Sequence, residues 1–222
     1  MKKVFVHGLG QVSDSWKKVI SFMEEPDQCV CTDLVLMLQG KEVSYQNLYE
    51  AFADFCDENE EPLDLCGLSL GGVLCLNYAV EHPEKVRSLV LIAAQYKMPK
   101  KLLQFQNILF RLMPESMFQQ MGFGKKEFIK LCKTMMNLDF GDSLEKIICP
   151  VMVLCGERDR ANKKESAKLA DLLRDAEFEV IDGAGHEVNI DTPDKLAKIL
   201  GNFYGRVNGQ RMRSITVRSG FR

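Results

Sequence analysis

Six short runs of apolar residues alternate with longer segments of helical periodicity along the chain. The apolar runs are residues 4–6, 29–34, 63–66, 86–93, 151–155 and 177–181. Most of them are continuously apolar, which is typical of parallel strands covered by helices on both faces. Helical patterns fill the gaps at residues 13–23, 45–59, 71–81, 164–175 and 193–204. The alternation predicts an α/β fold with a doubly wound, mostly parallel sheet of about six strands flanked by helices.

The gap between the fourth and fifth predicted strands is too long for one crossover helix. Residues 97–142 have the pattern of two or more amphipathic helices, so we predict a small helical lid inserted into a single domain of residues 1–205. The insertion is rich in methionine and phenylalanine. We expect Phe105, Leu109, Met113 and Met117 to line an adaptable apolar substrate pocket, and packing of the insertion onto the domain is the alternative role for such side chains.

Charge is distributed unevenly between the body of the chain and its C-terminal end. The formal net charge is −2, but residues 206–222 contain five arginines and no acidic residue, so residues 1–205 carry 24 basic against 31 acidic groups. We predict that this basic tail is disordered or foreign to the native chain. An acidic body has no clustered basic surface for phosphate contacts, so we expect no nucleic-acid partner.

The cysteines and the N-terminal residues bear on the cellular compartment. Cys29, Cys31, Cys66, Cys75, Cys149 and Cys155 lie in apolar stretches, where a reduced cysteine packs as a small hydrophobe. The first apolar run meets His7 and Gly8 too early for a signal peptide, and no stretch approaches the roughly twenty apolar residues of a membrane-spanning helix. We therefore expect a cytoplasmic protein without a membrane span or disulfides. No cysteine or histidine spacing indicates a zinc site, and we expect no metal or cofactor.

A glycine-rich motif around a serine directly follows the third predicted strand. Gly67-Leu68-Ser69-Leu70-Gly71, followed by Gly72, separates this strand from the next predicted helix. A nucleophilic serine at a strand-to-helix turn needs a sharp, strained backbone, and glycines two positions before and after it relieve the crowding. The pattern favours Ser69 as a nucleophile, with a glycine-rich turn that holds a serine by chance as the alternative.

Three histidines are available as the general base that such a serine needs. His82 lies in Glu81-His82-Pro83 at a predicted helix end, where a surface position is expected. His7 ends the first predicted strand, and His186 follows the last one in Gly183-Ala184-Gly185-His186. Because sites in open α/β sheets form at the carboxyl ends of the strands, His186 is the predicted base.

A carboxylate is needed to accept the other imidazole N–H and to orient the ring. Asp159 lies in Gly156-Glu157-Arg158-Asp159, after the fifth predicted strand, and precedes His186 in the chain. Both residues therefore follow a strand at its carboxyl end. Asp159 is the predicted orienting residue, and Glu157 is the alternative carboxylate.

With these motifs in this order, the sequence resembles the α/β-hydrolase superfamily, in its compact bacterial form, over nearly all of residues 2–204. The resemblance implies that the backbone N–H groups of Leu9 and Leu70 form an oxyanion hole, and that His7 holds its turn. Two features depart from the family pattern. The chain begins directly with the strand that leads to His7, and residues 33–40 lack the Asp-x-x-Gly-x-Gly found in many relatives.

The resemblance implies a carboxylesterase-like serine hydrolase that cleaves an ester or thioester through an acyl-enzyme. Its substrate is expected to be a small molecule with an apolar acyl or alcohol part. A carbon-carbon hydrolase, a lyase or an acyltransferase using the same three residues is an alternative, since one fold supports many chemistries. A ligand-binding homologue without catalysis is the third interpretation, although such proteins usually lose one of the three residues.

Overall fold

A computed structural model of the chain describes all residues except 99, 101–112, 116–117, 119–123 and 220–222, with the backbone alone for residues 210–219. Its centre is a six-stranded sheet in the order β2-β1-β3-β4-β5-β6, in which every neighbouring pair is parallel. The strands are β1 (Lys3–Val6), β2 (Cys29–Cys31), β3 (Leu63–Leu68), β4 (Val86–Ile92), β5 (Val151–Gly156) and β6 (Ala176–Ile181). The predicted doubly wound sheet is confirmed.

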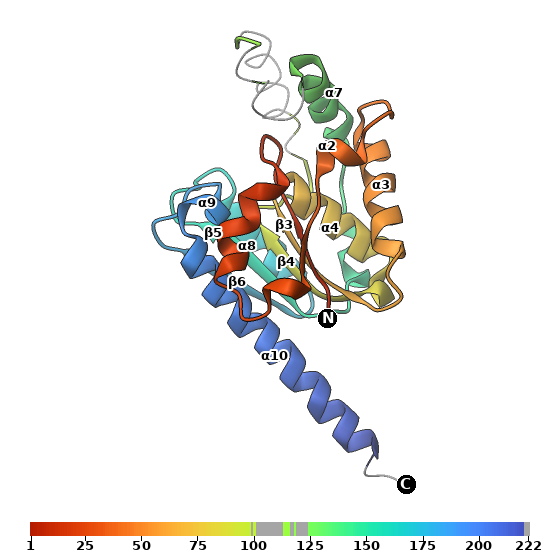
Figure 1. Cartoon of the computed structure of the whole chain (residues 1–222), viewed down its shortest axis with the longest axis vertical. Coiled ribbons are helices and arrows are strands. Elements are labelled where there is room, and N and C mark those ends of the chain that lie inside the picture. The colour runs from red at the N-terminus through yellow and green to blue at the C-terminus, as the bar shows by residue number, and fades with distance from the viewer. Residues whose placement is uncertain (99, 101–112, 116–117, 119–123, 220–222) are drawn as a thin grey trace.

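Helices cover both faces of this sheet (Figure 1). One core contains buried side chains of α3 (Tyr45–Asp57), α4 (Leu70–Glu81), α7 (Lys125–Met135) and α8 (Lys163–Leu172). The other contains buried side chains of α1 (Lys17–Ser21), α9 (Val188–Asp191) and α10 (Pro193–Ser219). Among the described residues, the remaining short helices are α2 (Leu34–Met37), η1 (Ser13–Trp16), η2 (Pro26–Gln28), η3 (Pro83–Lys85) and η4 (Gly141–Lys146). The four central strands β1, β3, β4 and β5 are thus buried on both sides, which explains their largely apolar sequences, whereas the edge strands β2 and β6 are partly exposed.

The second strand is shorter than the predicted run 29–34. It ends at Cys31, and the Asp33 side chain then accepts hydrogen bonds from the backbone N–H groups of Val35 and Leu36, at 3.1 and 3.0 Å. This N-cap starts α2, because it satisfies N–H groups that have no partner within the helix. The apolar residues after Cys31 therefore belong partly to a short helix rather than to the sheet.

The two ends of the segment between β4 and β5 lie side by side. Lys97 and Asp139 form an isolated antiparallel bridge, and their side chains form an ion pair at 2.6 Å. Adjacent backbone hydrogen bonds run from Met98 N to Leu138 O and from Phe140 N to Tyr96 O, at 3.0 and 2.8 Å. These contacts join residues 96–98 to residues 138–140, close to the ends of the predicted insertion 97–142, and α7 between them packs in the same core as α3 and α4.

The C-terminal segment contains residues 206–219 of the predicted basic tail. α10 continues without a break from Pro193 to Ser219, and its C-terminal half projects away from the body in Figure 1. Among the side chains described in α10, Val207 is the last that is buried. Apolar periodicity indicates burial rather than helical backbone, and this segment contains arginine, glutamine and methionine, which favour helices, and no proline. In the described part of the chain, no helix, α10 included, combines the length and the apolar character needed to cross a membrane.

All eight cysteines are free thiols, and six of them are buried. Burial raises the pKa of Cys31 to about 11 and that of Cys155 to about 11 as well. Thiols with such raised pKa values stay protonated and pack as apolar side chains. This agrees with the packing role predicted for them.

A buried ion pair near the amino ends of β3 and β4 gives the first testable prediction. Asp64 is fully buried and accepts hydrogen bonds from Arg87 Nε at 2.8 Å and Ser88 Oγ at 2.6 Å, and Arg87 Nη2 binds its other oxygen. Arg87→Met would leave the Asp64 carboxylate without its cation, so we expect the free energy of unfolding to fall by about 3–5 kcal/mol.

Urea unfolding measures this effect, and Arg206→Met is its matched control. Arg206 pairs with Glu177 at 2.6 Å, but both side chains are about half exposed. Such a surface pair contributes about 0–1 kcal/mol, so the control should unfold near the wild-type midpoint. Similar losses in the two variants would contradict the special role of the buried pair.

Candidate active site

Ser69 lies at the sharp turn between β3 and α4. Its φ of 53° and ψ of −114° place a non-glycine residue in a strained conformation of the kind found at functional sites. A Cβ atom at Gly71 would lie 2.2 Å from the carbonyl oxygen of Val6, and one at Gly67 would lie 2.4 Å from the Gly71 backbone. Only glycine fits at these two positions, so the motif predicted from the sequence forms the turn for a steric reason.

The Ser69 hydroxyl is not used to build the turn. Ser69 is the N-cap residue of α4, yet its side chain makes no capping hydrogen bond. The backbone N–H of Leu70, at the first position of α4, has no partner within the helix. Ser69, which is partly exposed, therefore lies beside a helix N-terminus, where the partial positive charge favours a developing anion.

Asp159 and His186 come together from the ends of neighbouring strands. The Asp159 Oδ2 atom lies 2.7 Å from His186 Nδ1, and Asp159 is buried whereas the His186 side chain is 45% exposed. A carboxylate only accepts hydrogen bonds, so Nδ1 carries the proton and a neutral ring keeps a free lone pair on Nε2. The alternative carboxylate, Glu157, instead accepts from the backbone N–H of Gly183 at 2.9 Å.

Asn162, which no sequence motif indicated, also holds the Asp159 carboxylate. Its Nδ2 atom lies 2.9 Å from both carboxylate oxygens, and its backbone N–H donates to Asp159 at 3.2 Å. Gln95, after β4, donates to Asn162 Oδ1 at 2.8 Å. Burial alone would raise the pKa of Asp159, but hydrogen bonds from His186 and Asn162 outweigh it and hold that pKa below its ordinary value.

The turn after β1 runs directly beside Ser69. Val6 pairs with Gly67 in the sheet, and a Cβ atom at Gly8 would lie 3.5 Å from the Cβ of Ser69. His7 is buried, with Nδ1 2.9 Å from Gly8 O and Nε2 accepting from Leu34 N at 3.2 Å. Burial lowers the pKa of His7, so it stays neutral and ties this turn to α2.

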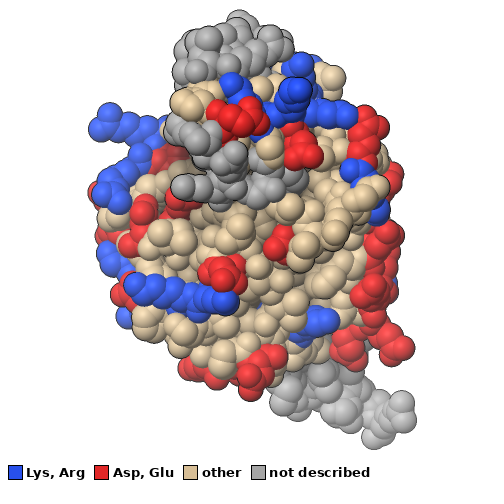
Figure 2. Space-filling view, turned by 45° about the horizontal axis from the view of Figure 1, so that its top comes forward, with Lys and Arg blue, Asp and Glu red and all other residues tan. Residues whose placement is uncertain are grey.

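The face that carries the carboxyl ends of the strands comes forward in Figure 2. Uncharged residues fill most of its middle, and charged side chains lie mainly around the rim. Of the four predicted pocket residues, Met113 is partly buried against the core that contains α3 and α4. Phe105, Leu109 and Met117 lie outside the described residues. Across the described ranges, no cluster of three or more histidine, cysteine or acidic side chains could hold a metal ion.

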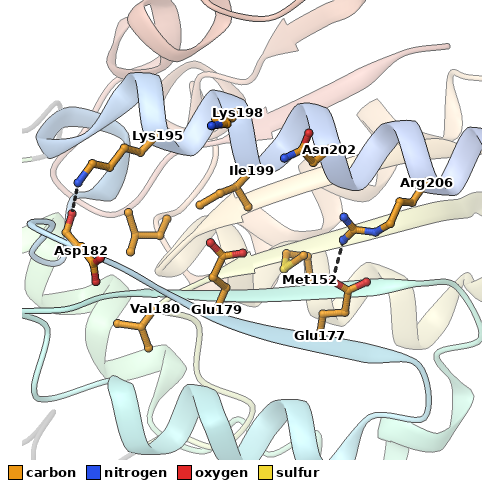
Figure 3. A pocket seen from close by; sticks show the side chains of 11 residues that line it. Met152, Glu177, Glu179, Val180, Asp182, Lys195, Lys198, Ile199, Asn202 and Arg206 are labelled. Atoms are coloured by element: carbon orange, nitrogen blue, oxygen red, sulfur yellow. Dashed lines mark hydrogen bonds and ion pairs between the residues drawn. The ribbon is translucent and has the colours of Figure 1, made fainter.

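A separate pocket of about 370 Å³ opens between β6 and α10 (Figure 3). Arg206 in this pocket binds Glu177 at 2.6 Å, and Lys195 donates to the carbonyl oxygen of Asp182 at 2.9 Å. Neither the candidate nucleophile nor the candidate base lines this pocket. We therefore do not assign the substrate site to it.

Several known proteins resemble this chain in sequence or share its architecture. The chain is 23% identical to monoacylglycerol lipase abhd6-B of Xenopus laevis, over 90% of this chain and 74% of that protein. An esterase from Thermogutta terrifontis matches the structure with a TM-score of 0.73 at 18% identity, covering 93% of this chain and 90% of the esterase. MenH from S. aureus matches with a TM-score of 0.75 at 16% identity, covering 94% of each chain. These likenesses show a common fold.

The family assignment rests on a match that spans most of the sequence. A model of the alpha/beta hydrolase family matches residues 4–199, a range that includes β2 to β6, all of β1 except Lys3, and every candidate site residue named above. Membership in this family supports a hydrolase activity. The chain therefore belongs to the alpha/beta hydrolase family.

Proposed function

We propose that this protein is a serine hydrolase that cleaves a carboxylic ester or thioester, with Ser69 as nucleophile, His186 as general base and Asp159 as the residue that orients the base. The observation that carries the proposal is the 2.7 Å hydrogen bond from His186 Nδ1 to Asp159, on the sheet edge where the Ser69 hydroxyl stands free. This arrangement leaves His186 Nε2 able to accept a proton. The family membership supports the same class of reaction.

The reaction proceeds in two acyl-transfer steps. Ser69 Oγ attacks the carbonyl carbon while His186 Nε2 takes its proton, and the resulting imidazolium is stabilised by Asp159. The bond to the leaving alcohol or thiol then breaks, and His186 protonates that group. Water, activated by His186 in turn, attacks the acyl-enzyme and releases the carboxylic acid and free Ser69.

The developing oxyanion is bound by two backbone N–H groups. Leu70 N–H lies at the start of α4, and Leu9 N–H lies in the turn whose Gly8 approaches Ser69. Such donors stabilise the transition state more than the ground state, because charge forms on the oxygen only as the bond is made. Each donor is expected to contribute on the order of a hundredfold in rate.

Labelling with a fluorophosphonate tests the nucleophile directly. The activated serine oxygen displaces fluoride from phosphorus, so one adduct per chain is expected in the intact mass, mapped to the peptide that contains Ser69. A folded protein without any adduct would contradict the proposal. An adduct at Ser69 without hydrolysis of any ester or thioester would instead favour carbon-carbon cleavage, elimination or acyl transfer.

The acyl-chain dependence tests the substrate class. We propose an apolar acyl or alcohol part because methionine and phenylalanine are abundant in the segment between β4 and β5, and because a relative is named as a monoacylglycerol lipase. Each buried methylene contributes about 0.8 kcal/mol, so kcat/KM for p-nitrophenyl esters should rise at least about tenfold from acetate to hexanoate. Rates that stay constant as the chain lengthens would exclude an apolar acyl site.

A further inference from the structure

The turn after β1 and the helix after His186 are joined by a buried pair of side-chain amides. Gln11 Nε2 donates to Asn189 Oδ1 at 3.1 Å, and Asn189 Nδ2 donates to Gln11 Oε1 at 3.2 Å. Gln11 is 6% exposed and Asn189 is fully buried. The second N–H of Gln11 reaches Glu187 Oε1, and that of Asn189 reaches the carbonyl oxygen of Ser15, each at 3.1 Å. Both amides thus use both of their donors.

The position of this pair is unexpected from the order of the strands. Gln11 follows β1 and Asn189 follows β6, and β3, β4 and β5 lie between those strands in the sheet. At a spacing of about 4.8 Å, β1 and β6 are about 19 Å apart. The chain after β6 therefore folds back towards the end of β1, and His186 lies within this returning segment, three residues before Asn189.

Gln11, the first residue of the pair, also closes a tight turn. Gln11 N donates to Gly8 O at 3.1 Å, and Gly10 has a φ of 90°, as in a type II turn, where a glycine is required at this position. Leu9 is the other central residue of the turn, and its N–H donates to no acceptor among the described residues. Because Gln11 closes the turn that contains Leu9, the contacts that hold Gln11 in place also set the position of the Leu9 N–H.

We propose that the Gln11–Asn189 amide pair is a positioning device that sets the Leu9 N–H and the His186 imidazole at the correct separation around Ser69. This inference rests on the proposed function. Gln11 and Asn189 do not touch the reacting atoms; they act through residues two and three positions away. Oxyanion donors are effective only within about 2.7–3.1 Å of the oxygen, and a displacement of about 1 Å can reduce a rate about a hundredfold.

Gln11→Leu is the first variant that tests the device. Leucine has a similar volume but forms no hydrogen bond with Asn189, so the turn and the returning segment lose their connection. With p-nitrophenyl butyrate as substrate, we expect kcat to fall between about tenfold and a hundredfold with KM within about twofold of wild type. Fluorophosphonate labelling of Ser69 should slow by a similar factor, because it also needs the oxyanion donors.

The matched control is Gln28→Leu, and a swapped pair is the rescue variant. Gln28 hydrogen-bonds Glu25 and Lys3 beside β2, so the same substitution there should leave kcat within about twofold of wild type. Gln11→Asn combined with Asn189→Gln keeps two amides and their total length. This double variant should recover most of the lost kcat, whereas a role in folding alone would change the melting temperature and leave kcat of the folded fraction unchanged.

The measurements distinguish a failure of the proposed hydrolase function from a failure of the positioning role alone. A wild-type protein that is neither labelled nor hydrolytic would overturn both. A labelled, hydrolytic wild type with unchanged kcat in folded Gln11→Leu would overturn the positioning role alone, as would a loss no larger than in Gln28→Leu. Should Gln11→Leu fail to fold, Gln11→Glu, which removes the donors to Asn189 and Glu187 but keeps the size, is measured with the same expected loss of kcat.

Discussion

Ser69→Ala should lower ester turnover by at least about 10⁴-fold while leaving the free energy of unfolding within about 0.5 kcal/mol of wild type. The loss of activity follows because alanine has no oxygen to form the acyl-enzyme. The stability is retained because the Ser69 side chain makes no capping hydrogen bond and alanine keeps its Cβ in the same backbone conformation. Hydrolysis of p-nitrophenyl butyrate and urea unfolding measure the two quantities.

Ser44→Ala provides the matched control, because Ser44 is also a helix N-cap. Its Oγ accepts a hydrogen bond from the backbone N–H of Asn47 at 3.1 Å at the start of α3. Removing a working cap costs about 1 kcal/mol of stability, so this variant should lose stability and keep its kcat. The two serines should therefore show opposite effects. Full activity in Ser69→Ala would exclude Ser69 as the nucleophile.

The sheet and the three candidate residues were predictable because their signals are local. Each of Ser69, Asp159 and His186 comes shortly after a predicted strand, and parallel strands bring their carboxyl ends to one edge. The glycines two positions before and after Ser69 also indicate the steric requirement of the turn, and they are visible in the sequence itself. A sequence window of a few residues therefore contains what is needed to place these side chains on the edge of the sheet.

The contacts between the site loops were not predictable in this way. Gln11 and Asn189 are separated by 178 positions, and nothing near either residue indicates its partner. Asn162 is the N-cap residue of α8, yet its side chain donates a hydrogen bond to Asp159 instead of capping the helix. Polar pairs of this kind have no periodicity, and their geometry depends on how the chain folds back after β6.

The helices α2 and α10 show the same limit on what apolar patterns can predict about secondary structure. Residues 34–37 are apolar, but the strand ends at Cys31 and the Asp33 cap starts α2. Beyond Val207, α10 continues although its apolar spacing has ended. Hydrophobic patterns report which face is buried, so they fail where a cap or an exposed segment decides the backbone conformation.

Asp159→Asn should reduce kcat about 10⁴-fold near neutral pH, with KM within about threefold of wild type. An amide in place of the carboxylate can donate a hydrogen bond to His186 Nδ1, which favours the tautomer that carries its proton on Nε2. That tautomer cannot accept the Ser69 proton, and the imidazolium also loses its stabilising charge. Since the pKa of Asp159 is lowered, the wild-type carboxylate stays ionised throughout the neutral range, and the large difference should persist across it.

Glu157→Gln tests which carboxylate orients His186, because the sequence left Glu157 as the alternative to Asp159. Glu157 is exposed and accepts from Gly183 N, and a glutamine carbonyl can accept the same hydrogen bond, so kcat should stay within about twofold of wild type. Both substitutions exchange one oxygen for an NH₂ group of nearly equal size, so packing differences do not complicate the comparison. A large loss in Glu157→Gln with little change in Asp159→Asn would transfer the orienting role to Glu157. It would also mean that the hydrogen bond from His186 to Asp159 has to rearrange before the reaction begins.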